Sequence, residues 1–224
     1  MKFVMSSIIA SLLVLWLAAG VLFLLHGCSG AGGGGGEPDL TDPDIVLLSD
    51  DMPDATKKDG EDQMCWAMAA CNVLVYAGYS EDENHCVSWF SMHRGNTPYN
   101  ALLAIRLYLT EYLGMSQAEY LEIRDHTIGL GVDATVWFMA GSIAINHPIA
   151  LHLYNSTTDT GHSVSVFGYK REENQFTFYV TDGDDNVHTR ELIVNYLNDD
   201  FDWQITWGYT EYKIGYAMTI EPIE

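Results

Sequence analysis

One cysteine in this chain stands where nucleophilic chemistry is feasible. Cys65 follows a polar, turn-prone stretch and opens an almost wholly apolar segment that ends at Gly78. That pattern predicts a helix with Asp62 as its N-cap, Gly78 at its C-terminal end and Cys65 in its first turn. Unpaired backbone N–H groups and the helix dipole lower the pKa of a thiol there and favour the thiolate. The alternative is a small, buried core residue.

A thiol nucleophile needs a base, and the base needs a group that orients it. His162 is the expected base, because it follows Gly161 and opens a segment with the composition of a strand, Ser163 to Tyr169. His147 and His152 compete for this role. His147 precedes a proline, and His152 lies within another expected strand, where a packed core histidine is common.

Asp182 is the expected orienting group. It follows His162 by 20 residues, which leaves room for one strand out, a turn at 171–174 and one strand back. The end of the returning strand then lies beside His162. An acidic surface turn and a calcium loop are the alternatives, although the twelfth position from Asp182 is Ile193 and not the glutamate of a full calcium loop.

The other cysteines indicate no metal site. The four cysteines are at positions 28, 65, 71 and 86 and form no CxxC pair, so a zinc site of the usual spacing is not indicated. Cys71 and Cys86 could form a disulfide outside the cytoplasm or remain buried thiols.

The N-terminal segment predicts export. An apolar run of about 23 residues, Phe3 to Leu25, is long enough to span a bilayer. It ends in Leu25-His26-Gly27-Cys28-Ser29, which resembles a bacterial lipobox with Cys28 as the lipid-anchored residue. We expect residues 1–28 to be a signal peptide with lipobox or an uncleaved membrane anchor, and 29–44 to be a glycine-rich and acidic linker. Either anchor places the domain of residues 45–224 outside the cytoplasm, in a bacterial cell envelope.

The order of the expected elements indicates an α+β fold, with helices first and an antiparallel sheet second. The expected helices follow Cys65 and span 100–113, 116–123 and 132–146, whereas 81–98 is expected to be irregular. The expected strands are 149–154, 163–169, 175–181, 203–207 and 213–220, with a short helix at 192–198. The net charge of −21 makes binding to nucleic acid or to an anionic membrane surface unlikely.

Three motifs in order resemble the IdeS/Mac group of immunoglobulin-degrading cysteine endopeptidases, within the papain-like superfamily. They are Asp54-Ala-Thr-Lys57 followed by Gly60, Asp62 and Cys65; Gly161-His162 with Phe167-Gly168; and Val180-Thr-Asp182-Gly-Asp184-Asp-Asn186. The resemblance covers residues 45–220 and implies a papain-like fold, with the catalytic cysteine at a helix start packed on the antiparallel sheet.

The resemblance also implies roles for individual residues. Cys65 would be the nucleophile, His162 the base and later acid, Asp182 the orienting acid and Asp184 a second acid near the site. Lys57 would bind the oxyanion together with the backbone N–H of Cys65; the chain is about two residues shorter here than the family pattern, so Lys58 stays an alternative. No cofactor or metal is implied.

We therefore expect an exported, membrane-tethered cysteine endopeptidase that acts on a protein substrate. Immunoglobulin is suggested as the substrate by family analogy alone. Two alternatives stay open. One is a transglutaminase-like acyltransferase, because those enzymes use Cys, His and Asp in the same chain order. The other is a non-catalytic surface-binding lipoprotein on the same fold.

Overall fold

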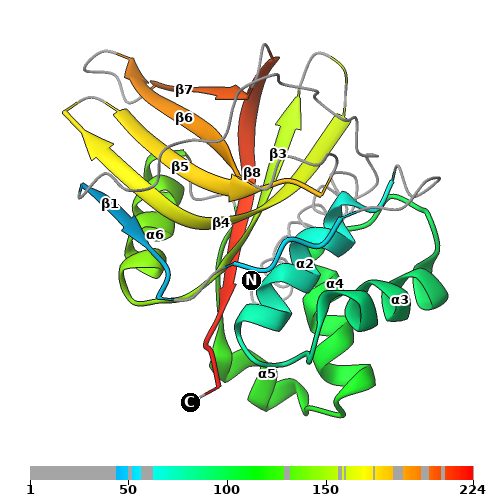
Figure 1. The fold of residues 1–224 in the computed structure, drawn as a ribbon. Helices are drawn as coiled ribbons and strands as arrows, with labels where there is room; N and C mark the ends of the chain where they lie inside the picture. Colours follow the sequence, from blue (N-terminus) through cyan, green and yellow to red (C-terminus); the bar gives the residue numbers. More distant parts are fainter. Residues whose placement is uncertain are drawn as a thin grey trace, which may run out of the picture.

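The computed structural model shows an α+β protein with its helices before most of its strands (Figure 1). It describes residues 44–49, 52–56, 63–128, 132–155, 158, 160–173, 175–183, 189–197, 202–207 and 210–223. The helices are α2 (Cys65–Tyr76), α3 (Glu83–Arg94), α4 (Ala101–Leu107), the π-helical turn η1 (Tyr108–Tyr112), α5 (Gln117–Ile123) and α6 (Val132–Ala144). The strands are β1 (Ile45–Leu47), β2 (Arg124–Ile128), β3 (Ile149–Asn155), β4 (Thr160–Glu172), β5 (Gln175–Thr181), β6 (Arg190–Leu197), β7 (Asp202–Trp207) and β8 (Thr210–Ile220). The predicted α+β class is confirmed.

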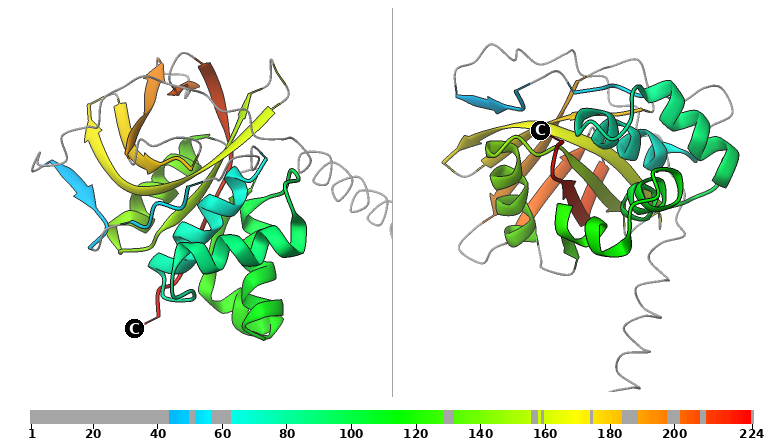
Figure 2. Two further views of the ribbon diagram at one scale, coloured as in Figure 1. Left: turned by 45° about the vertical axis from the view of Figure 1, so that its right-hand side comes forward. Right: turned by 90° about the horizontal axis from the view of Figure 1, so that it is seen from below.

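The strands form one antiparallel sheet that closes on itself. Its order is β1-β4-β3-β8-β7-β6-β5, and β4 pairs with β5 as well as with β3. Six strands therefore form a ring, to which β1 adds at β4 and β2 adds at β8. The sheet curves strongly, as Figure 2 shows from two further directions. Closure brings the start of β4, the end of β5 and the start of β6 to one end of the ring.

Local capping explains where three of the helices begin. Asn100 accepts hydrogen bonds from two backbone N–H groups of α4, and Asp82 accepts one from His85 of α3. Ser116 and Glu119 form a capping box at the start of α5, with the Ser116 N–H donating to the Glu119 carboxylate at 2.7 Å. Each cap satisfies backbone groups that a helix start leaves open.

Two sequence predictions of secondary structure are wrong. Residues 81–98 were expected to be irregular, yet they contain α3, with Asp82 as its N-cap and Gly95 at its end. Residues 192–198 were expected to be a short helix, yet they belong to β6, which pairs with both β5 and β7. Alternating burial in β6, with Leu192 and Val194 buried, is a strand pattern that the sheet enforces.

The apolar core is divided between the two faces of the sheet. One cluster joins α2, α3, α4 and α5 to residues of β3 and β8, among them Ala150 and Met218. The other joins α6 to residues of β3, β4, β5 and β6, among them Leu153 and Val164. Side chains alternate along each strand, so neighbouring residues of β4 face different clusters. This alternation decides which side of the sheet each candidate site residue occupies.

No helix in the described part of the chain is long and apolar enough to cross a membrane. The predicted export segment, residues 1–28 with Cys28, and residues 29–43 of the predicted linker lie outside the described residues.

The loop after β5 approaches α2 closely enough to require a glycine. A Cβ atom placed on Gly183 would lie 2.6 Å from Cβ and Cγ of Met68 and 2.8 Å from the carbonyl oxygen of Ala55. The Met68 Cβ atom and the Ala55 carbonyl oxygen are fixed by the backbone and cannot rotate away. A side chain at position 183 would therefore require α2 or the backbone at Ala55 to move.

We expect Gly183→Ala to lower the free energy of unfolding by about 2 kcal/mol, because it overpacks this contact. Gly141→Ala is the matched control, since Gly141 lies in α6 with nothing within 4 Å of its added Cβ. The control should be neutral or stabilise by up to about 1 kcal/mol. Urea unfolding of both variants measures the difference, and equal stabilities would contradict the close packing described here.

Candidate active site

Helix α2 carries the candidate nucleophile and is buried for most of its length. Ten of its 12 residues, from Cys65 to Leu74, are buried. Its N-cap is Met64, which makes no side-chain cap, so the prediction that Asp62 is the N-cap is wrong. Since α2 lacks a side-chain cap, its contacts with the sheet hold its first turn in place. Cys65 is the first residue of α2, as the sequence predicts.

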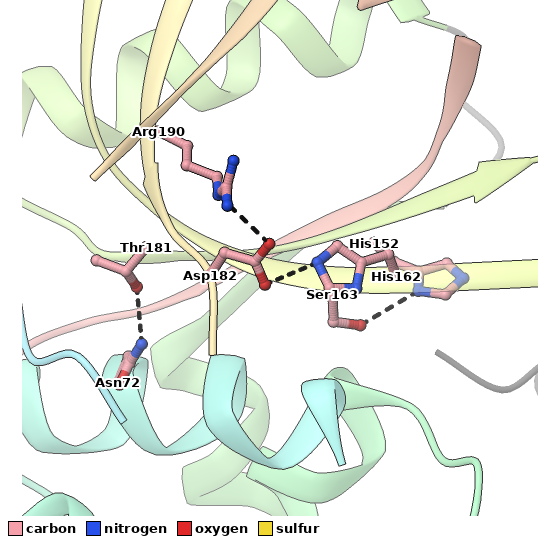
Figure 3. A network of polar contacts seen from close by, with 7 residues as sticks. All are labelled: Asn72, His152, His162, Ser163, Thr181, Asp182 and Arg190. Atoms are coloured by element: carbon pink, nitrogen blue, oxygen red, sulfur yellow. Dashed lines mark hydrogen bonds and ion pairs between the residues drawn. The ribbon is translucent and has the colours of Figure 1, made fainter. Parts of the chain in front are cut away.

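A buried amide joins α2 to two segments that lead toward the site. The Asn72 side chain accepts a hydrogen bond from the Ala55 N–H at 2.8 Å and donates one to Thr181 Oγ1 at 2.8 Å (Figure 3). Ala55 lies two residues before Lys57, and Thr181 directly precedes Asp182. Asn72 therefore sets the position of both segments relative to the helix that begins at Cys65.

His162 and Asp182 meet as the sequence predicts. His162 Nε2 donates to Asp182 Oδ1 at 2.9 Å, and both side chains are almost completely buried, with 0% and 1% of their surface exposed. The hairpin of β4 and β5 brings them together, because Ser165 pairs with Thr181 in its register. A carboxylate on Nε2 fixes the ring proton there and directs Nδ1 away from Asp182, as a base requires.

The histidine and the helix lie on opposite sides of β4. Side chains alternate along β4, so Ser163 and Ser165 face the side opposite to His162. Ser165 Oγ donates to the Ala69 carbonyl of α2 at 3.4 Å, which places α2 on that opposite side. His162 pairs with Leu153, whose side chain belongs to the other core cluster. A nucleophile on α2 would therefore reach His162 around the ends of the strands and not across the sheet.

The first turns of α2 pack near that end of the sheet. Met68 and Ala69, one helical turn after Cys65, contact Gly183 and Ser165. The Cys65 side chain is buried, with 2% of its surface exposed.

An arginine that sequence reasoning missed completes the buried group. Arg190 begins β6, and its Nε lies 3.9 Å from Asp182 Oδ2 while the side chain is only 10% exposed (Figure 3). One feature of the sequence could have indicated this role. Arg190 directly precedes residues that alternate between the two faces of the sheet in β6, and a cation buried at such a position needs a partner of opposite charge. Because that segment was expected to begin a helix at 192, the pairing of Arg190 beside Val180 was not foreseen.

His152 occupies a packed position, as its place within a strand suggests. Its ring stacks on Tyr216 with centroids 5.0 Å apart, and its Nδ1 lies 3.3 Å from Ser163 Oγ. Added Cβ atoms on Gly161 and Gly215 would approach this ring to 2.5 and 2.9 Å. Burial raises the pKa of the Tyr216 hydroxyl, although backbone N–H groups at the start of α4 oppose that effect.

Four of the remaining candidates lie outside the described residues. These are Lys57, the alternative Lys58, Asp184 and Cys28. Within the described ranges, no group of three or more His, Cys, Asp or Glu side chains could hold a metal ion.

Cys71 and Cys86 are buried free thiols, which decides between the two possibilities left by the sequence. Burial raises the pKa of the Cys71 thiol well above its usual value, and a hydrogen bond with Cys86 raises it further. Neither condition favours a thiolate at Cys71, so this cysteine is a poor nucleophile.

Comparison with known protein families finds no family model that matches this chain, and no curated protein matches it either. The assignment of function therefore depends on the residues and their geometry.

We expect Cys71 and Cys86 to resist alkylation at pH 8 in the folded, reduced protein, because both are inaccessible and the Cys71 pKa is raised. Iodoacetamide followed by peptide mass spectrometry reads each cysteine separately. In denaturant both should react fully. Modification of either residue in the folded state, at the rate seen in denaturant, would contradict the burial described here.

Proposed function

We propose that this chain is a cysteine endopeptidase with a papain-like fold, which hydrolyses peptide bonds of a protein substrate. The observation that carries the proposal is the buried hydrogen bond between His162 and Asp182, at the end of the sheet against which the first turns of α2 pack. A histidine oriented by a carboxylate can act as the base that activates a nucleophile. Cys65, at the start of the helix that packs near this pair, is the proposed nucleophile.

The proposed mechanism uses Cys65, His162 and Lys57 as follows. The Cys65 thiol transfers its proton to His162 Nδ1, and the sulfur attacks the peptide carbonyl carbon to give a tetrahedral oxyanion. The Cys65 N–H at the start of α2 and the Lys57 ammonium stabilise that negative charge. As the C–N bond breaks, His162 returns its proton to the leaving amine and a thioester remains on Cys65. Water, deprotonated by His162, attacks the thioester, releases the carboxylic acid product and restores the thiol.

The remaining parts of the proposal depend on the sequence. Asp184 serves as a second acid, and residues 1–28 anchor the protein to the outside of a bacterial membrane, through a lipid on Cys28 or through an uncleaved helix. The substrate is a protein, and immunoglobulin is suggested by the family resemblance. The net charge of −21 suits a basic substrate segment.

We expect cleavage to require a thiol reductant and to be lost in Cys65→Ala, by about 10³-fold or more, because the nucleophile is absent. His162→Gln should lower the rate comparably and Asp182→Asn by about 10²-fold, since the latter only loses orientation of the ring. The assay incubates the purified chain with a proteome digest and with intact immunoglobulin G, and new N-termini are read by mass spectrometry.

Two controls make this test specific. His85→Gln changes a histidine of α3 that contacts Tyr112, away from the β4–β5 hairpin, and should leave cleavage unchanged. Thermal unfolding of each variant separates loss of fold from loss of chemistry. Full activity of a folded Cys65→Ala variant would reject the mechanism.

The burial of Cys65, with 2% of its surface exposed, favours a second candidate, a non-catalytic surface-binding protein on the same fold, because an inaccessible thiol is a poor nucleophile. The reactivity of Cys65 distinguishes the two. A reduced chain whose Cys65 alkylates with an ordinary thiol pKa of about 8.5, and which cleaves nothing, supports the binding protein. Incorporation of a labelled primary amine into a protein substrate without chain cleavage supports the third alternative, the acyltransferase.

A further inference from the structure

Arg190 places a permanent positive charge beside the candidate base. Asp182 divides its two carboxylate oxygens between two partners: Oδ1 accepts from His162 at 2.9 Å, and Oδ2 lies 3.9 Å from Arg190 Nε. The second distance is that of an ion pair and too long for a hydrogen bond. Figure 3 shows the guanidinium pointing at the carboxylate from the side opposite to the imidazole.

Among the described residues, the ionisable groups that meet at this point come from three strands. His162 lies on β4, Asp182 directly follows β5 and Arg190 begins β6. A buried carboxylate is stable only when it is paired. His162 could supply the charge by taking up a proton, but Arg190 already supplies it at every pH at which the protein is folded.

We propose that Arg190 is a positioning residue: by pairing with Asp182, it keeps the His162 ring neutral, with its proton on Nε2. The neutral ring is the form that can accept the Cys65 proton. The catalytic meaning of this inference rests on the proposed function, whereas the effect of Arg190 on the His162 ring does not.

Removal of the cation should favour the imidazolium form. Without Arg190, the Asp182 charge is balanced best by a protonated His162, so the titration midpoint of the ring should rise by about one pH unit. In an active enzyme, the limb of the kcat/KM pH profile that reports the titration of His162 should move to higher pH by the same amount.

The experiment is an NMR titration of ring-labelled histidines in the reduced full chain, with the His162 signal assigned from its absence in His162→Gln. Arg190→Gln should raise the His162 midpoint by about one unit, and Arg190→Lys should keep it within about 0.3 unit of wild type, because the charge is retained. Arg171→Gln is the matched control, since Arg171 stacks on Trp137 near the other end of β4. An unchanged midpoint in Arg190→Gln, or an equal change in Arg171→Gln, would overturn the proposal.

A double-mutant cycle tests whether the effect passes through Asp182. In an Asp182→Asn background, Arg190→Gln should move the His162 midpoint by less than about 0.3 unit. A shift as large as in the wild-type background would mean that Arg190 acts on the ring directly, and would overturn its role as a positioning residue.

A third measurement does not depend on Arg190→Gln being folded. The Arg190 Nε–H signal, assigned from its absence in Arg190→Lys, should change its chemical shift in Asp182→Asn, because the carboxylate charge 3.9 Å from Nε is removed. An unchanged chemical shift would contradict the pairing. Because none of these titrations uses a substrate, a chain that cleaves nothing yet shows the expected shifts refutes the proposed function and leaves the role of Arg190 standing.

Discussion

The buried side chain of Asn72 fixes where α2, the helix that begins at Cys65, lies. α2 is apolar on nearly every face, and apolar contacts alone would tolerate small shifts and rotations against the sheet. A buried amide tolerates much less, because each hydrogen bond it loses leaves a polar group unsatisfied at a cost of about 1–3 kcal/mol. Asn72 bonds to Ala55 on one side and Thr181 on the other, so one side chain holds three separate segments in register.

The same logic of satisfied polar groups applies at His162. Its carboxylate partner carries a charge in a region with almost no exposure, and Arg190 balances that charge from the neighbouring strand. A closed ring of strands makes this possible, since β5 can offer Asp182 to β4 on one side and to β6 on the other. In an open sheet with β5 at its edge, the carboxylate would have lost one of its two neighbours.

Much of the fold and two members of the candidate site could be predicted from local sequence patterns. The capping box at Ser116, the strands later found as β3, β5 and β8, and the approach of Asp182 to His162 were all encoded over short distances in the chain. A hairpin of known length fixes which residues face each other, and so the pairing followed from counting residues.

The features that could not be predicted depend on partners far away in the chain. β6 was mistaken for a helix because a short apolar run fits a helix or a strand, and pairing with β5 and β7 decides for the strand. Arg190 was missed for a related reason, since its partner Asp182 lies beyond the end of another strand.

The short strand β1 also has a mechanical consequence. It pairs with β4 over three residues, Ile45 to Leu47, and Leu48 adds a bond to the Phe167 carbonyl at 2.9 Å. The chain then continues to the segment that Asn72 holds and on to Cys65. Tension applied to the chain before Ile45 therefore has to detach β1 from β4 before it passes along the backbone to the segment that precedes α2. β1 thereby separates pulling on the N-terminal side from the packing of α2 against the sheet.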